Sequence, residues 1–502
     1  MGLLLAACAP VGPDFVKPDP DAPGQWLEPP DYGLDPAVEV ASQWWKLLND
    51  PVLDQLIETA QRRNNNLEIA GLRVLEARAQ LGVAIGSQYP QSQFAQGSAS
   101  YVSPSENTGL NGNFWQYGLG ANIAWEIDFW GRFRRGIESA DAAYLASIAA
   151  YDLAMVLLTA QVVDTYIIIR SSEEQLRIAK ENVAIQQRSY DITSVLYKNG
   201  QSSELDMQQA NTLLLSTLAT IPSLEVAIKQ ARNALSVLLG QAPGTVTEAL
   251  GDGPIPALPQ QLSVGLPADM LRRRPDVRQA ELVALSQNAL VGLAEADLYP
   301  SFSLTGSIGL SAGSPGNSSF GDLFTSEALT FSIGPSFVWP FLNYGRIRNT
   351  VRVQDARLQQ ALVNYRETVL QAAREAEDAM AAYIGARQQA DILKQTVASA
   401  RRSNELSTLR YREGFSDYQR VLDAQQSLFT QQQRYVTNTS ETVRSVVALF
   451  KALGGGWEGR AAYPFVDPET LDEMKQRTNW GDLLDTPAPD ATADGEIHAV
   501  DW

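Results

Sequence analysis

The sequence has very little of the chemistry on which enzymes and metal proteins depend. Its 502 residues contain one cysteine and one histidine, which argues against disulfide bonds, thiol chemistry and zinc sites. The formal net charge of −18 argues against nucleic acid as a partner, because the phosphates would be repelled. No uninterrupted apolar run approaches the ~18 residues of a membrane-spanning helix, so we expect none.

The chain does contain an internal repeat. Landmarks of the first unit recur in the same order 210 residues later, and after one turn 214 residues later. We therefore predict two copies of one unit, at 51–240 and 267–454, joined by a linker at 241–266. The matched landmarks include Tyr89-Pro90 and Tyr299-Pro300, Gly131-Arg132 and Gly345-Arg346, and Gly200 and Gly414.

Each unit is predicted to contain a very long helix. Residues 133–198 and 347–412 lack proline and are rich in alanine, glutamine, glutamate and arginine. About 66 residues would rise about 100 Å, and no helix of that length is stable as a lone rod. Return helices should pack beside them, which gives helical hairpins at about 132–239 and 346–453.

One difference between the copies is expected in the return helices. Pro222 falls inside the first, whereas its counterpart in the second is Val436. Proline cannot donate a helix hydrogen bond, so the sequence predicts a kink in one copy only.

Each unit is also predicted to contain a β-hairpin, at about 92–129 and 301–342. Aromatic and aliphatic residues alternate there with small and polar ones, most clearly from Trp115 to Phe129; Phe94 and Tyr101 mark a weaker stretch. Strands of about 13 to 15 residues are longer than the usual five or six of soluble sheets. The pattern favours a transmembrane β-barrel wall, and the alternative is a half-buried soluble sheet.

The number of strands predicts an oligomer. Four strands cannot close a barrel, and open edges in lipid would leave backbone groups unsatisfied. Several chains must therefore share one barrel, and a trimer supplies twelve strands.

The single cysteine lies close to the first residue. Cys8 follows Leu5-Ala6-Ala7, which resembles a bacterial lipobox; the alternative is an incidental cysteine. Residues 1–8 would then be a truncated signal peptide and 9–50 an N-terminal tether and equatorial segment. The expected lipid is S-diacylglycerol with N-palmitoyl on Cys8, and no other cofactor is expected. The segment 455–502 ends in an acidic tail expected to be partly disordered.

Several motifs, taken in order, resemble one family. They are Cys8–Phe15, Trp44-Trp45, Asp128–Arg132, Arg273–Val277, Tyr299-Pro300 and Gly345–Arg348. The chain resembles the outer membrane factors of the TolC superfamily, in their OprM/NodT-like lipoprotein branch. This implies an α+β homotrimer with a shared twelve-stranded barrel in the outer membrane of a Gram-negative bacterium, above a periplasmic α-helical tunnel. It implies the passive exit duct of a tripartite efflux pump, docked through a periplasmic adaptor protein to an inner-membrane transporter of the RND type.

The resemblance also implies site residues, none of them catalytic. We expect a periplasmic gate at the helical tips, where Asp206 and Arg420 would pair in the closed state; the alternative is ordinary solvated charges. The gate residues are Glu204, Asp206, Asp417, Arg420 and Asp423. The expected adaptor contacts, which are alternatively caps and bundle core, are Gly200, Leu205, Gly414, Val421 and Leu422. The expected membrane-interface aromatics are Trp115, Trp125, Trp130 and Trp339.

Two other functions remain open. A periplasmic hydrolase would use paired carboxylates such as Glu126 and Asp128, although their alternation with aromatic residues fits a lumen face. A structural coiled-coil lipoprotein, or the duct of another export system, would explain the helices. The exported substrate is not readable from the sequence.

Overall fold

The computed structural model describes most of the chain. The described residues are 10–17, 25–27, 34–35, 42–105, 107, 112–246, 250–251, 253–265, 273–313, 319–457 and 464–484. Cys8 and most of the acidic tail lie outside these residues, so the expectations about them stay predictions.

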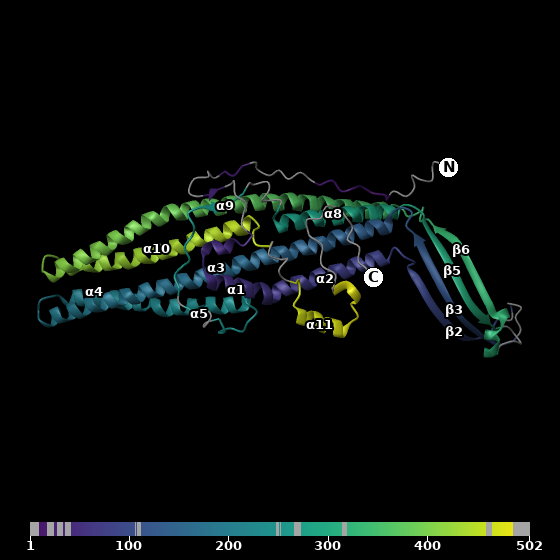
Figure 1. Cartoon of the computed structure of the whole chain (residues 1–502), viewed down its shortest axis with the longest axis horizontal. Helices are drawn as coiled ribbons and strands as arrows, with labels where there is room; N and C mark the ends of the chain where they lie inside the picture. The colour runs from purple at the N-terminus through teal and green to yellow at the C-terminus, as the bar shows by residue number, and fades with distance from the viewer. Residues whose placement is uncertain are drawn as a thin grey trace.

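The chain is elongated, with helical hairpins at one end and a β-sheet at the other (Figure 1). Two helices of 67 residues each run from the sheet to the far tips, α3 (Arg132–Lys198) and α9 (Arg346–Arg412). They correspond to the runs without proline at 133–198 and 347–412. The return helix of the second hairpin is α10 (Tyr418–Ala452), which packs along α9 and α3.

The return helix of the first hairpin is interrupted. It consists of α4 (Glu204–Leu218) and α5 (Thr220–Leu238), with Ala219 between them. Pro222 lacks the N–H that the carbonyl of Leu218 would accept, and Leu218 is the last residue of α4. The kink predicted for one copy only coincides with this break, and α10 continues through Val436 without one.

Shorter helices surround the middle of the long ones. They are α1 (Pro51–Arg63), α2 (Asn65–Gly86), α8 (Pro275–Ala296) and, on the outside, α11 (Pro468–Arg477), with short 3-10 turns at Trp44–Leu48 and Gly481–Leu484. Trp44 is buried and stacks on Phe450, with ring centroids 5.1 Å apart. A two-residue parallel pairing joins β1 (Leu34–Asp35) to β4 (Leu262–Ser263). These elements anchor the middle of the chain around one apolar core.

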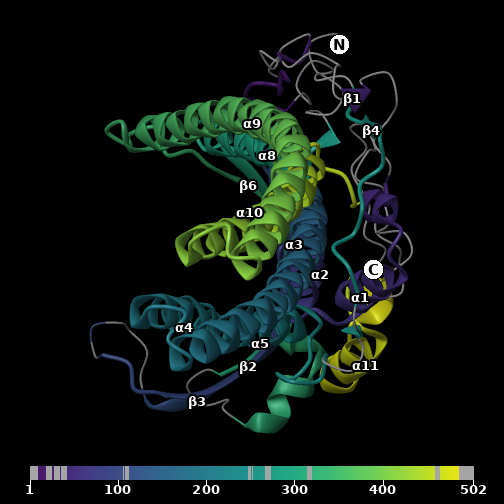
Figure 2. The same ribbon diagram turned by 90° about the vertical axis from the view of Figure 1, so that its left-hand side faces the viewer.

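Viewed from the tips, the helices form an open arc (Figure 2). The segments β1, β4, α1 and α11 lie on the outside of the arc, and its concave side is uncovered. The chain is therefore a curved shell rather than a closed bundle.

Two helical segments carry more apolar surface than the sequence analysis expected. By length and composition, α3 and the α4–α5 segment each contain an 18-residue stretch apolar enough to cross a membrane. The stretch in α3 is 61% buried against its neighbours, as in a core helix, whereas that in α4–α5 is 17% buried. The described residues leave most of this flank of α4–α5 exposed.

The four longer strands form one antiparallel sheet. They are β2 (Ser92–Val102), β3 (Phe114–Ile127), β5 (Ser301–Ala312) and β6 (Leu329–Val338), in the order β2-β3-β5-β6. The pairing of β3 with β5 joins the hairpins of the two repeats. Two 3-10 turns, Phe320–Phe324 and Ser326–Ala328, lie between β5 and β6. The outer strands β2 and β6 have one neighbour each in the described chain.

The register brings the apolar residues onto one face of the sheet. Leu119 lies opposite Leu310, Ile308 opposite Phe331, and Phe302 opposite Phe337. Directly opposed residues share a face, so serine, glycine, asparagine and glutamine residues cover the other face. Phe94 is the exception to the expected pattern. It lies opposite Asn122 and therefore belongs to the polar face, not to the apolar stripe of its strand.

Candidate functional site

The described residues leave the apolar face of the sheet uncovered. Ile308 exposes 54% of its surface and Phe331 69%, although both lie in the middle of their strands. Soluble monomers rarely expose a contiguous apolar face that spans neighbouring strands in this way.

Aromatic residues concentrate at the end of this face farthest from the helices. Trp115 stacks on Tyr117 at 6.1 Å and contacts Tyr101 at 5.5 Å between ring centroids. Tyr117 in turn meets Phe320 edge to face at 5.4 Å. Trp115 thus lies at one rim of the sheet.

The other three predicted aromatics lie at the opposite rim, where strands meet helices. Trp125 Nε1 donates to the carbonyl of Gln88 at 3.1 Å, and Trp339 Nε1 donates to that of Leu298 at 3.1 Å. Both acceptors directly precede a Tyr-Pro pair, so the same contact occurs in both repeats. Each indole therefore fixes the bend between a helix and the sheet.

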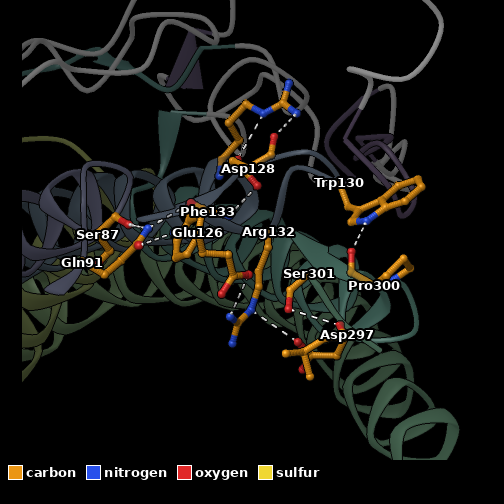
Figure 3. Close-up of polar contacts among 12 residues, drawn as sticks. Ser87, Gln91, Glu126, Asp128, Trp130, Arg132, Phe133, Asp297, Pro300 and Ser301 are labelled. Atoms are coloured by element: carbon orange, nitrogen blue, oxygen red, sulfur yellow. Dashed lines mark hydrogen bonds and ion pairs between the residues drawn. The ribbon is translucent and has the colours of Figure 1, made fainter. Parts of the chain in front are cut away.

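Trp130 makes a related contact at the same rim (Figure 3). Its Nε1 donates to the carbonyl of Pro300 at 2.8 Å, and its ring stacks on Tyr299 with centroids 4.5 Å apart. The four tryptophans thus divide between two rims, one with Trp115 and one with Trp125, Trp130 and Trp339.

Charged residues join the sheet to the long helix at this rim (Figure 3). Asp128 accepts from the backbone N–H groups of Phe133 at 3.2 Å and Arg134 at 3.0 Å, so it caps α3. Arg132 reaches Glu126 at 3.5 Å and Asp297 at 3.3 Å, which links β3 to the end of α8. The carboxylates that a hydrolase would need are therefore occupied as a helix cap and an ion pair.

The N-terminal segment 10–17 is fastened next to the same rim. The Val11 N–H donates to the carbonyl of Trp130 at 2.9 Å. Arg135, which is buried, donates to the Val11 carbonyl at 3.2 Å and to Asp14 at 2.9 Å. Asn288 Nδ2 donates to the carbonyl of Pro13 at 2.8 Å. The segment is thus held between α3 and α8.

At the opposite end of the molecule, both helical hairpins turn on a glycine. Gly200 and Gly414 have φ of 70° and 78°, in the left-handed region that favours glycine. The next N–H in each case, Gln201 or Phe415, donates to a carbonyl of the preceding helix at 2.8 and 2.9 Å. The spacing of glycine and helix end therefore builds the same C-cap in both repeats.

Below these turns, a small core fastens the two hairpins together. Tyr418, Val421 and Ala210 are buried in it, and Tyr190, Tyr411 and Leu422 pack around them. Val421, predicted as an adaptor contact, is 1% exposed and lies in this core, and Leu422 is half-buried against it. The bundle-core alternative holds for Val421, while Leu205, which is 64% exposed, stays on the surface.

The tyrosines of this core are the tip residues that the sequence reasoning missed. Burial raises the pKa of Tyr418 to about 12 and also raises the pKa of Tyr411. Both line a hollow of about 830 Å³ together with Asp206, Arg188 and Asp417. Tyr411 recurs as Tyr197 in the first repeat, which was the available signal.

Within one chain the structure gives Asp206 and Arg420 other partners, and their pairing in the closed state stays a prediction. Asp206 accepts from Ser202 Oγ at 2.8 Å and from the Ser203 N–H at 3.3 Å, as part of a capping box that begins α4. Arg420 instead lies 3.8 Å from Asp417, which caps α10. Each charge therefore serves its own helix end.

The remaining predicted gate residues are exposed at the tips. Asp423 accepts from Gln419 Nε2 at 2.8 Å, and Gln419 in turn accepts from Gln209 of the other hairpin at 3.2 Å. Glu204 is exposed in the first turn of α4. Within the described part of the chain, no three His, Cys, Asp or Glu side chains form a cluster able to hold a metal ion.

Comparison with known proteins relates this geometry to one family. The family described as "Outer membrane efflux protein" matches residues 56–241 and 266–455. The "Probable outer membrane lipoprotein SilC" of Salmonella typhimurium is 31% identical over 460 residues, covering 90% of this chain and 97% of the relative. "Nodulation protein T" of Rhizobium leguminosarum bv. trifolii is 29% identical, covering 91% and 96%.

Solved structures have the same fold. The outer-membrane channel OprN superposes with a TM-score of 0.84 at 32% identity, covering 89% of this chain and 99% of that one. A CusC structure superposes with a TM-score of 0.76 at 29% identity, covering 89% and 100%.

Proposed function

The chain belongs to the outer membrane efflux protein family, and from this premise we propose that three copies form the exit duct of a tripartite efflux pump. The twelve strands of the homotrimer close one barrel in the outer membrane, and the six helical hairpins close a periplasmic tunnel. The duct is passive, because a continuous wet lumen with a closable end needs no catalytic group.

The sheet is the observation that carries this proposal. Its apolar face is exposed, and its outer strands β2 and β6 each have one partner in the described chain. In lipid such edges must be paired, so β2 of one copy would meet β6 of the next. When the barrel closes, the polar face of the sheet becomes the wall of an aqueous lumen.

The spacing of the two aromatic rims supports a position in the membrane. Trp115 and Trp125 are ten residues apart on β3. At about 3.4 Å per residue and a tilt of about 40°, they lie about 26 Å apart along the barrel axis. This matches the apolar band of outer-membrane barrels, which is about 25 Å tall and flanked by aromatic girdles.

The helices support the same assembly. The arc of Figure 2 is open, and the apolar stretch of α4–α5 is mostly exposed at one flank of it. On the other flank α9 exposes Leu370 and Ile392. In the trimer, the α9 flank of one copy would cover the α4–α5 flank of its neighbour.

Covalent lipid at Cys8 would anchor each copy beside the barrel. Pro10 is the first described residue, and Val11 is hydrogen-bonded at the sheet-helix rim. The segment that follows Cys8 in the sequence is thus held at this rim, which supports an anchor on the barrel side of the molecule. A diacylglycerol group and an N-palmitoyl chain there would enter the adjacent leaflet.

The helical tips are proposed as the regulated entrance and the adaptor contact. The exposed turn residues Gly200 and Gly414, with Leu205 beside them, form the contact surface, and Leu422 borders it from the tip core. Asp417 and Asp423 line the entrance with negative charge and favour cations. The periplasmic adaptor and an inner-membrane RND transporter complete the pump.

The exported substrate is selected mainly by the inner-membrane transporter rather than by this chain. Relatives of nearly equal identity carry the names "Cation efflux system protein CusC", "Toluene efflux pump outer membrane protein TtgC" and "Pyoverdine export outer membrane protein OpmQ". One duct architecture thus occurs with chemically unrelated cargoes, which supports a choice of substrate made by the inner-membrane transporter.

Mass measurement in detergent and conductance in planar bilayers test the proposal. We expect a trimer that resists dissociation in unheated detergent samples, and discrete single-channel currents after reconstitution. A monomer that stays dissolved without detergent and carries no current would contradict it, because the apolar face would then have no lipid to contact.

A further inference from the structure

The polar face of the sheet carries one aromatic side chain in its middle rows. Phe94 lies in register with Asn122, Ser307 and Ser332, one residue from each of the four strands. Phe114 is the other aromatic of this face in the described strands, but it is buried at the far rim opposite Val102. Phe94 is 51% exposed and lines a hollow with these three polar residues.

The second repeat shows that the fold does not require an aromatic residue there. Asn122 corresponds to Ser336, 214 residues later, and Ser336 lies opposite Ser303. In the sheet register Ser303 therefore lies at the position that Phe94 has in the first repeat, one residue before Leu304, which the sequence offset of 210 matches to Phe94. An apolar ring exposed to water has a cost that serine avoids, and about half of the Phe94 surface is exposed, so burial alone does not explain the aromatic residue.

We propose that Phe94 is a contact site for aromatic cargo inside the barrel lumen. This inference rests on the proposed function, since the lumen exists only in the closed trimer. Twelve strands about 4.8 Å apart and tilted by about 40° enclose a backbone cylinder about 24 Å across. Three Phe94 rings project into that space at one level, among serine, asparagine and glycine.

The chemistry favours planar aromatic molecules, above all cationic ones. An exposed ring stacks on aromatic groups and attracts cations over its face, each by a modest free energy. The three Ser303 side chains, at the matching positions of the second repeat, offer neither interaction. Such weak contacts retard an aromatic molecule without trapping it, which suits a duct.

Block of single-channel current by tetraphenylphosphonium tests the site. Tetrabutylammonium serves as the cation without aromatic rings, and both are added from the side of the barrel. We expect F94S to weaken block by tetraphenylphosphonium between about twofold and tenfold and to leave block by tetrabutylammonium unchanged. F94S introduces the residue that the second repeat already has, so the barrel should assemble.

The repeat also supplies the matched variants. S303F should strengthen block by adding three rings, and the exchange F94S/S303F should restore block toward the wild type. Gln96, on the same face two residues along β2, provides the control Q96S, which should leave block unchanged. Equal tetraphenylphosphonium affinity in wild type and F94S, or an equal change for both cations, would overturn the assignment. A wild type without any channel current would instead overturn the proposed function itself.

Discussion

A charge placed on either face of one strand distinguishes a sheet in a membrane barrel from a sheet in a soluble protein. Ile308 and Ser307 are neighbours on β5, and they lie on the apolar and the polar face respectively. Ile308 pairs with Ala121 and Phe331, about midway between the two aromatic rims. In the proposed trimer, Ile308→Arg puts a guanidinium into the hydrocarbon core and Ser307→Arg puts it into the lumen.

The expected cost differs between the two variants. An arginine at the midplane of a β-barrel destabilises it by about 2–4 kcal/mol, which is about 6–12 kcal/mol for three copies. The Ile308 side chain is 54% exposed, so little intramolecular packing is lost and the membrane term dominates. Ser307→Arg should leave stability nearly unchanged and shift the channel towards anions.

Urea unfolding in phospholipid vesicles measures this difference, and gel mobility before and after heating reports the trimer. Ile308→Arg should unfold at clearly lower urea and yield less trimer than Ser307→Arg. Equal stability of the two variants would refute the assignment of the faces, because a soluble sheet with both faces in water tolerates arginine on either.

Three further predictions concern the rims and the tips. Trp339→Phe removes the hydrogen bond to Leu298 but keeps most of the ring, so it should cost about 0.5–1.5 kcal/mol in urea unfolding, and Trp125→Phe the same; no loss in either would mean that the indoles do not fix the bends. Tyr418 has its pKa raised to about 12 by burial, so the folded protein keeps a proton that the unfolded chain releases near pH 10; stability should fall between about pH 10 and 12, and Tyr418→Phe should reduce that fall. Urea midpoints at pH 9 and 11.5 measure this, and an unchanged fall in the variant would contradict it. Asp206→Ala removes the N3 carboxylate of the capping box that begins α4, and with it hydrogen bonds worth about 1 kcal/mol, so it should loosen the tip and raise closed-state current. Arg420→Ala should change the current little, and equal effects of the two variants would support the predicted pair instead.

The periodicity of the sequence was enough to place the long elements. The long helices at 133–198 and 347–412 and the interruption at Pro222 follow from local rules, because helix geometry and the missing proline N–H act within four residues. The apolar and polar faces of β3, β5 and β6 follow from a period of two in the same way.

The register of the weakest strand did not follow from its pattern. In β2 both Phe94 and Tyr101 are aromatic, yet they are an odd number of residues apart and must lie on opposite faces. Only pairing with β3 decides which of the two is on the apolar side.

The partners of the charged residues at the helical tips could not be predicted from the sequence either. Correspondence between repeats placed Asp206 and Arg420 at equivalent positions, and opposite charge suggested a pair. Their partners in the structure are local, a capping box for Asp206 and the adjacent cap residue Asp417 for Arg420. Contacts within three or four residues require no long-range positioning, so they outcompeted a contact between hairpins.

The interruption at Ala219 makes the two hairpins mechanically unequal. One return helix, α10, is continuous, whereas the other is divided into α4 and α5 roughly halfway along. In the proposed ring of six hairpins, interrupted and continuous return helices would alternate, so the tunnel would be threefold rather than sixfold in its stiffness. When the tunnel entrance widens, the hairpins that contain the break at Ala219 would bend first, and the aperture would become triangular before it became round.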